Sequence, residues 1–196
     1  RQMCIRDSLN IAFAATGATA AGASAALKAK GIEDVVVVGW AGDGGTYDIG
    51  IQALSGAAER NDDIIYICYN NEAYMNTGIQ RSGATPYKAW TTTTPFGKLE
   101  WKKELFLIVL SHGVPYAATA CPSYPVDLCN KVRKAREKRG FRFIEILCPC
   151  PPGWRFPANK TVELGKLAVE CGLWPLMEVE DGALEFTGPT KAIVEG

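Results

Sequence analysis

The chain has 196 residues, of which 47% are apolar and 21% charged, as is ordinary for a globular protein with its own core. It carries 21 Lys or Arg and 21 Asp or Glu, so its net charge is zero, and its longest apolar runs are far too short to span a bilayer. These features argue against a nucleic-acid partner and against a membrane protein. The seven Cys residues form no CxxC motif, which indicates a reducing compartment, and we expect a cytoplasmic protein.

The first residues differ from the remainder of the chain. Residues 1–8 contain the string MCIRDS, whose reverse translation resembles an adapter used in sequencing libraries, and we exclude them from the fold argument. Residues 9–196 show neither an internal repeat nor a linker. We therefore expect one domain, incomplete at both ends and truncated at its N-terminus.

In chain order, the first half predicts helices and strands that alternate. An alanine-rich stretch from Asn10 to Lys30 predicts a helix that stops at Gly31. The apolar run Val35–Gly39 predicts a strand buried on both faces. A helix should follow from Tyr47 to Arg60, then a second buried strand. The second strand is expected over Ile64–Tyr69. Four residues are expected on the buried face of the helix: Ile49, Ala53, Leu54 and Ala57.

The second half continues the alternation after a long loop. Gly, Pro, Ser and Thr dominate from Asn70 to Gly97, and an ordered loop of that length is unusual unless it is functional. A hairpin should span Leu176–Phe186, turning at Asp181 and Gly182. The helices and strands expected between loop and hairpin are Trp101–His112, Val114–Ala118, Pro125–Arg139, Phe141–Leu147 and Lys160–Gly172. This order predicts an α/β fold with a mostly parallel sheet flanked by helices.

One carboxylate, Asp43, lies within a glycine cluster that follows the first predicted strand. The cluster matches neither the GxGxxG nor the Walker phosphate pattern. A carboxylate beside a phosphate requires a cation between them, and Mg²⁺ is held by one or two carboxylates or amides together with substrate phosphates. Asn71 follows the next predicted strand, twenty-eight residues beyond Asp43. The pair predicts a magnesium site, the alternative being that Asp43 and Asn70-Asn71 are only turn or capping residues.

Longer motifs identify a family. The segments GDGGTYDIGIQALSGAAERNDDIIYICYNNEAYMNTGIQRSGATP, WTTTTPFGK and PCPPGWRF resemble the β subunits of pyruvate:ferredoxin oxidoreductases, within the 2-oxoacid:ferredoxin oxidoreductase family. The resemblance extends from about Asn10 to the end. It implies a thiamine diphosphate-binding fold and pyruvate synthase activity, which is the oxidative decarboxylation of pyruvate to acetyl-CoA and CO₂ with electron transfer to ferredoxin.

The resemblance also implies roles for individual residues. Asp43 and Asn71 would bind Mg²⁺ through side-chain oxygens, and Ala73 through its backbone carbonyl. Asn76 would lie beside the thiazolium ring and contact the 2-oxo acid, the alternative being a turn residue that precedes Gly78. Gly42 and Gly44 would line the diphosphate of the cofactor. Thr77 and Gly78 would line the cofactor beside Asn76.

Cys150 matches the family cysteine that ligates a 4Fe–4S cluster, whose other ligands lie upstream in the family and outside this chain. Cys148 is expected to be a buried thiol rather than a ligand, and His112 a helix-end residue. The remaining cysteines are expected to pack as small apolar side chains: Cys68, Cys121, Cys129 and Cys171.

The implied partners are the alpha, gamma and delta subunits of a hetero-oligomer, together with ferredoxin, pyruvate and coenzyme A. The carboxylate that activates the cofactor comes from another subunit in this family, so we expect this chain alone to be inactive. Relatives acting on branched-chain 2-oxo acids or 2-oxoglutarate, and other thiamine diphosphate enzymes, stay open as alternatives. A structural or nucleotide-binding α/β subunit without thiamine diphosphate is the non-enzyme alternative.

Overall fold

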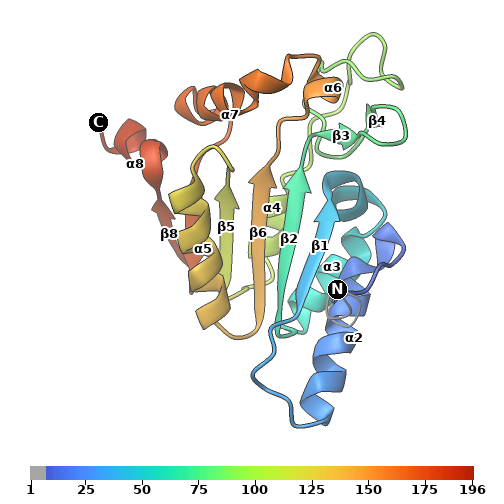
Figure 1. Ribbon diagram of the computed structural model, residues 1–196, viewed down its shortest axis with the longest axis vertical. Helices are drawn as coiled ribbons and strands as arrows, with labels where there is room; N and C mark the ends of the chain where they lie inside the picture. The colour runs from blue at the N-terminus through green and yellow to red at the C-terminus, as the bar shows by residue number, and fades with distance from the viewer. Residues whose placement is uncertain (1–7) are drawn as a thin grey trace.

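The computed structural model describes residues 8–196, and most of the adapter-like stretch, residues 1–7, lies outside the described residues. Six strands form one sheet in the order β1-β2-β6-β5-β7-β8 (Figure 1). The first four strands are parallel to one another, β7 is antiparallel to β5, and β8 is antiparallel to β7, which confirms the predicted mostly parallel α/β fold. The strands are β1 (Val38–Gly42), β2 (Ile64–Asn70), β5 (Tyr116–Ala120), β6 (Phe141–Leu147), β7 (Met177–Glu180) and β8 (Ala183–Phe186).

Helices cover both faces of the sheet. Figure 1 shows α5 in front of the sheet, and apolar residues of α2, α3 and α4 form one buried cluster with the opposite face. None of the helices within residues 8–196 combines the length and apolarity needed to cross a bilayer. The α-helices are α2 (Thr16–Ala29), α3 (Ile51–Glu59), α4 (Leu105–Leu110), α5 (Pro125–Glu137), α6 (Pro151–Trp154), α7 (Thr161–Glu170) and α8 (Gly188–Glu195).

Shorter elements complete the fold. A two-stranded antiparallel sheet is formed by β3 (Ala73–Tyr74) and β4 (Gln80–Arg81), so the predicted loop Asn70–Gly97 is wrong over these residues. Neither α6 nor α8 was expected from the sequence, since both contain proline close to glycine. Short helical turns occupy Phe13–Ala15, Gly44–Asp48 and Ala158–Lys160.

The first strand departs from its prediction. It begins at Val38 rather than Val35, and it forms the edge of the sheet with β2 as its neighbour. Helix α2 packs on the face that carries Gly39, whereas Val38 and Trp40 on the other face are 50% and 59% exposed. The prediction of a strand buried on both faces is therefore wrong, because four consecutive valines do not indicate whether a strand lies at the centre or the edge of a sheet.

Other boundaries shift by a few residues. Helix α3 starts at Ile51, after the turn Gly44–Asp48, so Ile49 is exposed rather than on the buried face, while Leu54 and Ala57 are buried as expected. Helix α4 starts four residues later than predicted, and β5 is displaced by two. Strands β2 and β6, helix α5 and the β7–β8 hairpin lie where the sequence places them, because their apolar patterns and stop signals agree.

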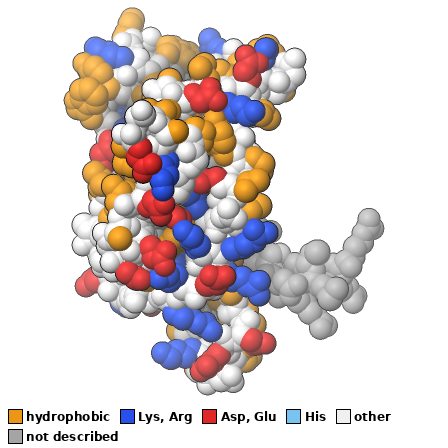
Figure 2. Space-filling view, turned by 90° about the vertical axis from the view of Figure 1, so that its left-hand side faces the viewer, with side chains coloured by type: hydrophobic (Ala, Val, Ile, Leu, Met, Phe, Trp, Pro, Cys, Tyr) orange, Lys and Arg blue, Asp and Glu red, His pale blue; other side chains and the backbone are white. Residues whose placement is uncertain are grey.

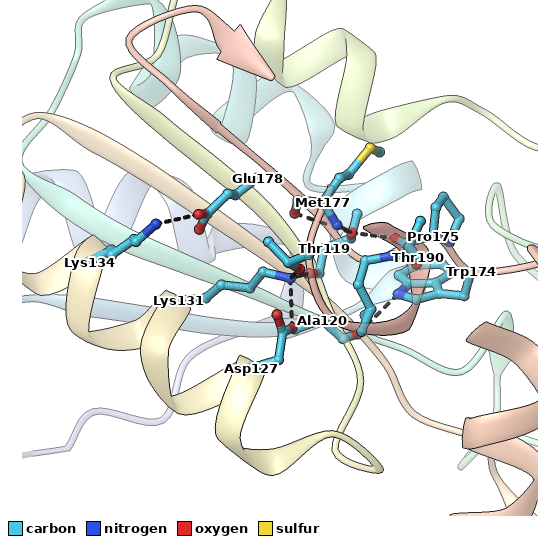
Figure 3. Close-up of polar contacts among 12 residues, drawn as sticks. Thr119, Ala120, Asp127, Lys131, Lys134, Trp174, Pro175, Met177, Glu178 and Thr190 are labelled. Atoms are coloured by element: carbon cyan, nitrogen blue, oxygen red, sulfur yellow. Dashed lines mark hydrogen bonds and ion pairs between the residues drawn. The ribbon is translucent and has the colours of Figure 1, made fainter. Parts of the chain in front are cut away.

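A buried lysine joins α5 to the C-terminal part of the sheet. Lys131, 1% exposed, donates hydrogen bonds from Nζ to the Thr119 carbonyl oxygen at 2.8 Å and to Asp127 Oδ2 and Thr187 Oγ1, both at 2.7 Å (Figure 3). Burial lowers the pKa of Lys131, and the adjacent Asp127 carboxylate opposes that change. Because all three N–H groups have acceptors, Lys131 fixes α5 against β5 and the start of α8.

The outer face of α5 and the C-terminal hairpin is electrically balanced. Figure 2 shows Lys or Arg interspersed with Asp or Glu over this face. A groove of about 800 Å³ beside α5 is likewise lined by both signs, so it does not favour an ion of either charge. Ion pairs across the face are Lys134–Glu178, Lys138–Glu180 and Lys191–Glu185.

Candidate metal and cofactor site

Two strand ends and a short sheet bring the predicted metal ligands together. Asp43 follows β1 directly, Asn71 follows β2 directly, and Ala73 opens β3. Strands β1 and β2 are parallel neighbours with Gly42 opposite Tyr69, so both carboxyl ends lie at one edge of the sheet. That edge is where ligands bind in open α/β sheets.

One end of the Asn71 side-chain amide lies 3.0 Å from Asp43 Oδ1 and 2.7 Å from the Ala73 carbonyl oxygen. Adjacent octahedral ligands of Mg²⁺, each 2.0–2.1 Å from the metal, are about 2.9 Å apart, which is close to both spacings. Without a cation, Nδ2 occupies this end of the amide and donates hydrogen bonds to both oxygens. With a cation between the three groups, Oδ1 would take the same position and complete a set of three oxygen ligands. The donor set therefore fits a magnesium ion.

Asp43 is a buried carboxylate, only 1% exposed. Its Oδ2 accepts a hydrogen bond from Ser82 Oγ at 2.5 Å, and its Oδ1 accepts a longer one from the Asn71 backbone N–H at 3.4 Å. Burial raises the pKa of Asp43 to about 6, against these hydrogen bonds, which lower it. A bound cation beside Oδ1 would favour the ionised carboxylate.

Glu72 supplies the backbone reversal between the two other candidate ligands. Its φ of +67° lies in the left-handed region, which is uncommon for a residue other than glycine. Its N–H donates to Asn70 Oδ1 at 2.9 Å, and its carbonyl oxygen accepts from Thr85 Oγ1 at 2.5 Å. Burial also raises the pKa of the Glu72 carboxyl to about 7. This strained turn places the Asn71 side-chain amide and the Ala73 carbonyl oxygen side by side.

The packing of neighbouring tyrosine rings explains why glycines flank Asp43. A Cβ on Gly44 would lie 2.3 Å from the Tyr74 ring, whose hydroxyl donates to the Gly44 carbonyl oxygen at 2.9 Å. A Cβ on Gly42 would approach the Tyr69 ring at 3.2 Å. The packing of these rings thus requires small residues, and a role for the glycines toward a diphosphate stays a prediction.

The predicted substrate-facing residues lie in a different place. Asn76, Thr77 and Gly78 form the exposed turn of the β3–β4 hairpin. Thr77 Oγ1 donates to Gln80 Oε1 at 2.5 Å, and Gly78 has a φ of +121°. No hydrogen bond within the described residues joins this turn to Asp43, Asn71 or the Ala73 carbonyl, so the chain does not by itself gather all predicted residues.

A buried polar network beneath the candidate ligands was missed by the sequence reasoning. Glu145 lies in β6, 2% exposed, and accepts hydrogen bonds from the Tyr47 hydroxyl and from Asn70 Nδ2, the latter at 2.8 Å. Burial raises the pKa of Glu145, while both hydrogen bonds oppose that shift. The signal was present in the sequence, since Glu145 is the one acidic residue in the mostly apolar stretch Phe141–Leu147. The network supports Asn70, whose Oδ1 in turn holds the Glu72 backbone.

The cysteine segment contacts the candidate metal site through a tryptophan. Cys150 is half-buried and directly precedes α6. Trp154 at the end of α6 donates from Nε1 to the Asn71 carbonyl oxygen at 2.9 Å. Burial raises the pKa of Cys148 to about 11, although this side chain is only half-buried rather than fully buried as expected. Among residues 8–196, no three His, Cys, Asp or Glu side chains cluster as a metal site, so a cluster on Cys150 would need thiolates from outside them.

The other cysteines divide into two groups. Cys68 and Cys121 are fully buried, as expected for small apolar side chains, but Cys129 and Cys171 are exposed, so that prediction is wrong for the latter pair. Both exposed cysteines lie on the outer surface of helical segments. His112 follows α4, with Nε2 2.8 Å from Ser55 Oγ and Nδ1 2.9 Å from the Ile108 carbonyl oxygen, as a helix-end residue should.

Comparisons with known proteins show the family of the chain. Residues 2–146 match the family described as thiamine pyrophosphate enzyme, C-terminal TPP binding domain. The chain is 58% identical over 184 residues to pyruvate synthase subunit PorB of Methanothermobacter thermautotrophicus, covering 91% of this chain and 64% of that protein. It is 53% identical over 188 residues to ketoisovalerate oxidoreductase subunit VorB of Pyrococcus abyssi, covering 91% and 60%. The chain thus spans less than two thirds of the length of these relatives.

A solved structure shares the fold. The 2-oxoglutarate:ferredoxin oxidoreductase from Magnetococcus marinus, with 2-oxoglutarate, coenzyme A and succinyl-CoA bound, aligns with a TM-score of 0.69 and 23% identity over 93% of this chain and 67% of that chain. The family match covers most of the sequence, including the strand ends that carry Asp43 and Asn71. The chain therefore belongs to the thiamine pyrophosphate enzymes and contains their C-terminal TPP-binding domain.

Proposed function

We propose that this chain is the cofactor-binding part of the β subunit of a pyruvate:ferredoxin oxidoreductase. The convergence of the Asp43 carboxylate, the Asn71 side-chain amide and the Ala73 carbonyl carries the proposal, because these groups can offer three oxygens to the metal that accompanies a diphosphate. The pyruvate assignment is supported by relatives named pyruvate synthase subunit at 50–58% identity. Relatives named ketoisovalerate oxidoreductase subunit, at 52–53% identity, support a branched-chain 2-oxo acid as the second candidate substrate.

In this proposal, Asp43, Asn71 and the Ala73 carbonyl hold Mg²⁺, and the diphosphate lies against Gly42 and Gly44. When bound, thiamine diphosphate supplies a carbanion that adds to the 2-oxo carbon and an electron sink for decarboxylation. The protein contributes position and electrostatics. The Asp43 carboxylate balances the metal charge, and its burial strengthens that attraction.

The remaining predicted residues take supporting roles. Asn76 contacts the 2-oxo acid, and Thr77 and Gly78 form the wall beside it once the hairpin turn meets the rest of the complex. Cys150 gives one of the four thiolates of a 4Fe–4S cluster, which accepts the electrons. The alpha, gamma and delta subunits supply the remaining site groups, coenzyme A accepts the acetyl group, and ferredoxin receives the electrons.

Substitution of the carboxylate ligand tests the metal site. In the complete subunit within its complex, Asp43→Ala should weaken Mg²⁺-dependent retention of thiamine diphosphate by about 100-fold or more, since loss of mere supporting residues already costs 10–100-fold at metal sites. Isothermal titration with Mg²⁺ and cofactor measures this. Asp62→Ala is the control, because Asp62 forms only an exposed ion pair with Arg60. Equal cofactor occupancy in the Asp43 variant and the wild type would overturn the assignment.

The substrate is tested separately. The assembled complex should show a kcat/KM for pyruvate at least about 10-fold above that for 2-oxoisovalerate, the difference expected when extra methylenes do not fit a pocket. Ferredoxin reduction measured with each acid gives the ratio. A ratio below one would assign the complex to branched-chain 2-oxo acids and leave the cofactor site unaffected.

A further inference from the structure

A carboxyl group lies in the apolar interior behind the candidate metal site. Glu145 belongs to β6, is 2% exposed, and lies opposite Cys68 of β2 and Thr119 of β5. Among the described residues, its hydrogen-bond partners are neutral groups, the Tyr47 hydroxyl and the Asn70 amide. An ionisable group removed from water costs free energy, so a carboxyl buried with neutral partners requires a reason beyond packing.

One oxygen of this carboxyl accepts both hydrogen bonds. Glu145 Oε1 accepts from the Tyr47 hydroxyl and, at 2.8 Å, from Asn70 Nδ2, which also lies 3.2 Å from the Tyr47 hydroxyl oxygen. All three side chains belong to residues that are at most 3% exposed. A buried donor that loses its acceptor costs free energy, so the three groups hold one another in one arrangement.

The Asn70 amide transmits this arrangement to the turn that carries two candidate ligands. Because its Nδ2 faces Glu145, its Oδ1 faces the other way and accepts from the Glu72 N–H at 2.9 Å. This bond closes a tight turn in which Glu72 has a φ of +67°. A reversed amide would set Nδ2 against the Glu72 N–H, donor against donor. Glu145 therefore decides how the backbone between Asn71 and Ala73 is held.

The Tyr47 hydroxyl connects Glu145 to the turn that carries the third candidate ligand. Tyr47 lies in the helical turn Gly44–Asp48, which directly follows Asp43. The Tyr47 carbonyl oxygen accepts from Lys103 Nζ at 2.5 Å, so this turn is held through its backbone as well as through the buried ring. Glu145 on β6 thus holds side chains from both turns that follow β1 and β2.

We propose that Glu145 is a positioning residue of the candidate metal site: its Oε1 fixes the Tyr47 hydroxyl and the Asn70 amide, and these hold the two turns that present the metal ligands. The metal itself rests on the proposed function. Because Glu145 acts as an acceptor of two hydrogen bonds, a neutral acceptor of the same shape should replace it, whereas an apolar side chain of similar size should not.

Two substitutions of similar shape separate the acceptor from the charge. In the complete subunit within its complex, Glu145→Gln keeps a side-chain oxygen for both donors, and the affinity for Mg²⁺ at saturating thiamine diphosphate should stay within about 3-fold of the wild type. Glu145→Met removes the acceptor and should lower this affinity about 10- to 100-fold. Isothermal titration measures both values. Equal losses in the two variants would mean that charge matters rather than position, and would overturn the proposal.

A buried glutamate away from the site provides the matched control. Glu178 of β7 is 4% exposed, accepts from the Tyr116 hydroxyl at 2.7 Å and forms an ion pair with Lys134, so its loss should cost at least as much stability. Glu178→Met should lower the melting temperature without changing the affinity for Mg²⁺. If it weakened magnesium binding as much as Glu145→Met, the effect of Glu145 would be general destabilisation, and the proposal would be wrong.

Hydrogen exchange measures the coupling in the absence of metal and cofactor. The Glu72 N–H is bonded to Asn70 Oδ1, so in the metal-free subunit it should exchange about 10-fold faster in Glu145→Met than in the wild type. Glu145→Gln and the control Glu178→Met should leave this rate unchanged. An unchanged rate in Glu145→Met would show that the Asn70 amide keeps its orientation without Glu145, which would contradict the proposal.

Tyr47→Phe tests the connection to the other turn, and it does so even if Glu145→Met does not assemble. Loss of the hydroxyl should lower the affinity for Mg²⁺ about 3- to 10-fold, as for one hydrogen bond. In the Glu145→Met background the same change should add little, because the acceptor is already absent. Unchanged affinity in the single variant, or fully additive losses, would contradict an action of Tyr47 through Glu145.

Comparison of wild type and variant separates failure of this proposal from failure of the proposed function. If the wild-type complex binds Mg²⁺ with thiamine diphosphate and Glu145→Met binds them equally well, Glu145 is not a positioning residue and the proposed function stands. If the wild-type complex binds no thiamine diphosphate in the presence of Mg²⁺, the proposed function fails, and the role of Glu145 toward the metal fails with it.

Discussion

Asp43 can act as a metal ligand only if its carboxylate points toward the metal. Two neighbouring hydrogen-bond donors, Ser82 and Trp154, contact the candidate ligands Asp43 and Asn71. Ser82 Oγ donates to Asp43 Oδ2, which leaves Oδ1 toward Asn71 and the Ala73 carbonyl. Trp154 Nε1 donates to the Asn71 carbonyl oxygen. Groups that orient metal ligands are often as important as the ligands themselves. Neither residue was predicted from the sequence, although both lie within the motifs that identified the family.

Ser82→Ala removes the donor on Asp43 and leaves its backbone in place. We expect the affinity for Mg²⁺, titrated at saturating thiamine diphosphate, to fall about 10-fold. The melting temperature of the free chain should change little by comparison, since the lost group is one hydroxyl. Ser111→Ala serves as the control, because Ser111 donates only to the Ile108 carbonyl oxygen at the end of α4. An unaltered magnesium titration would show that Ser82 does not position Asp43.

Trp154→Phe keeps most of the ring and removes the N–H that reaches Asn71. The expected result is an affinity for Mg²⁺ lower by about 3- to 10-fold, corresponding to one ordinary hydrogen bond. Trp174→Phe is matched to it, because Trp174 Nε1 also donates to a backbone oxygen, that of Ala120, at 3.0 Å but away from the site. That control should lower the melting temperature without changing magnesium binding. If Trp154→Phe binds Mg²⁺ as tightly as the control Trp174→Phe, the Trp154 N–H does not contribute to the metal site and Trp154 is only a packing residue.

At the scale of elements, the parallel register of the sheet sets the site. Strand β2 pairs with β1 on one side and β6 on the other, with Gly42 opposite Tyr69 and Glu145 opposite Cys68. Asp43, Asn70 and Glu145 therefore lie near the same end of the sheet. The opposite end of β2 is held by Asp63, which contacts Arg142 at the start of β6 and Arg139 before it. Burial alone would raise the pKa of Asp63, but the two guanidinium groups outweigh burial and lower it.

Asp63→Asn should destabilise the chain most at neutral pH. A carboxyl whose pKa is lowered by folding stabilises the folded state at pH values above 3.8, its pKa in the unfolded chain. This contribution is lost as the pH falls through the lower pKa of the folded state. Arg142 is 2% exposed and would lose its counter-charge, so we expect a loss of about 1–3 kcal/mol, reduced because Asp63 itself is 38% exposed.

Urea denaturation at several pH values measures this effect. The difference between wild type and Asp63→Asn should shrink in strong acid, where the carboxyl of the wild type is protonated. Asp62→Asn, in an exposed pair with Arg60, should change the free energy of unfolding by less than about 1 kcal/mol. A difference between wild type and Asp63→Asn that stays constant with pH would exclude the ion pair as its cause.

Sequence patterns located some elements better than others. Helix α5 was predicted well because Pro125 at its start and Gly140 after its end are strong signals that act locally. Strand β1 was not, because the position of a strand within a sheet depends on neighbours far along the chain. Glu145 was likewise overlooked, since its hydrogen bonds to Tyr47 and Asn70 join residues 98 and 75 positions away.

At the scale of the whole molecule, the chain exposes two features near the candidate site. The residues that would face a substrate lie on a surface turn, and residues 87–101 expose large apolar side chains such as Phe96 and Trp101. Both features suit a chain that completes its site with other subunits. The balanced charge of the opposite outer face, shown in Figure 2, gives no comparable signal for a partner.

This chain alone should not reduce ferredoxin with pyruvate. The described residues offer one candidate cluster thiolate, Cys150, where a 4Fe–4S cluster needs four ligands. Anaerobic assays with thiamine diphosphate, Mg²⁺, coenzyme A and ferredoxin should give the same rate with and without the chain. The complete complex is the positive control. Ferredoxin reduction by the isolated chain above that background would contradict the proposed division of the site among subunits.

The sequence by itself determined the family and the alternation of helices and strands, and it predicted Asp43 and Asn71 as candidate ligands, because motifs and apolar periodicity are local properties of the chain. Only the tertiary structure decided that the side chains of these residues meet the Ala73 carbonyl, and that Ser82 and Trp154 contact them. It also decided that β1 is an edge strand and that residues 87–101 expose large apolar side chains. The physical reason is that convergence, burial and exposure depend on contacts between distant segments, which no local pattern records.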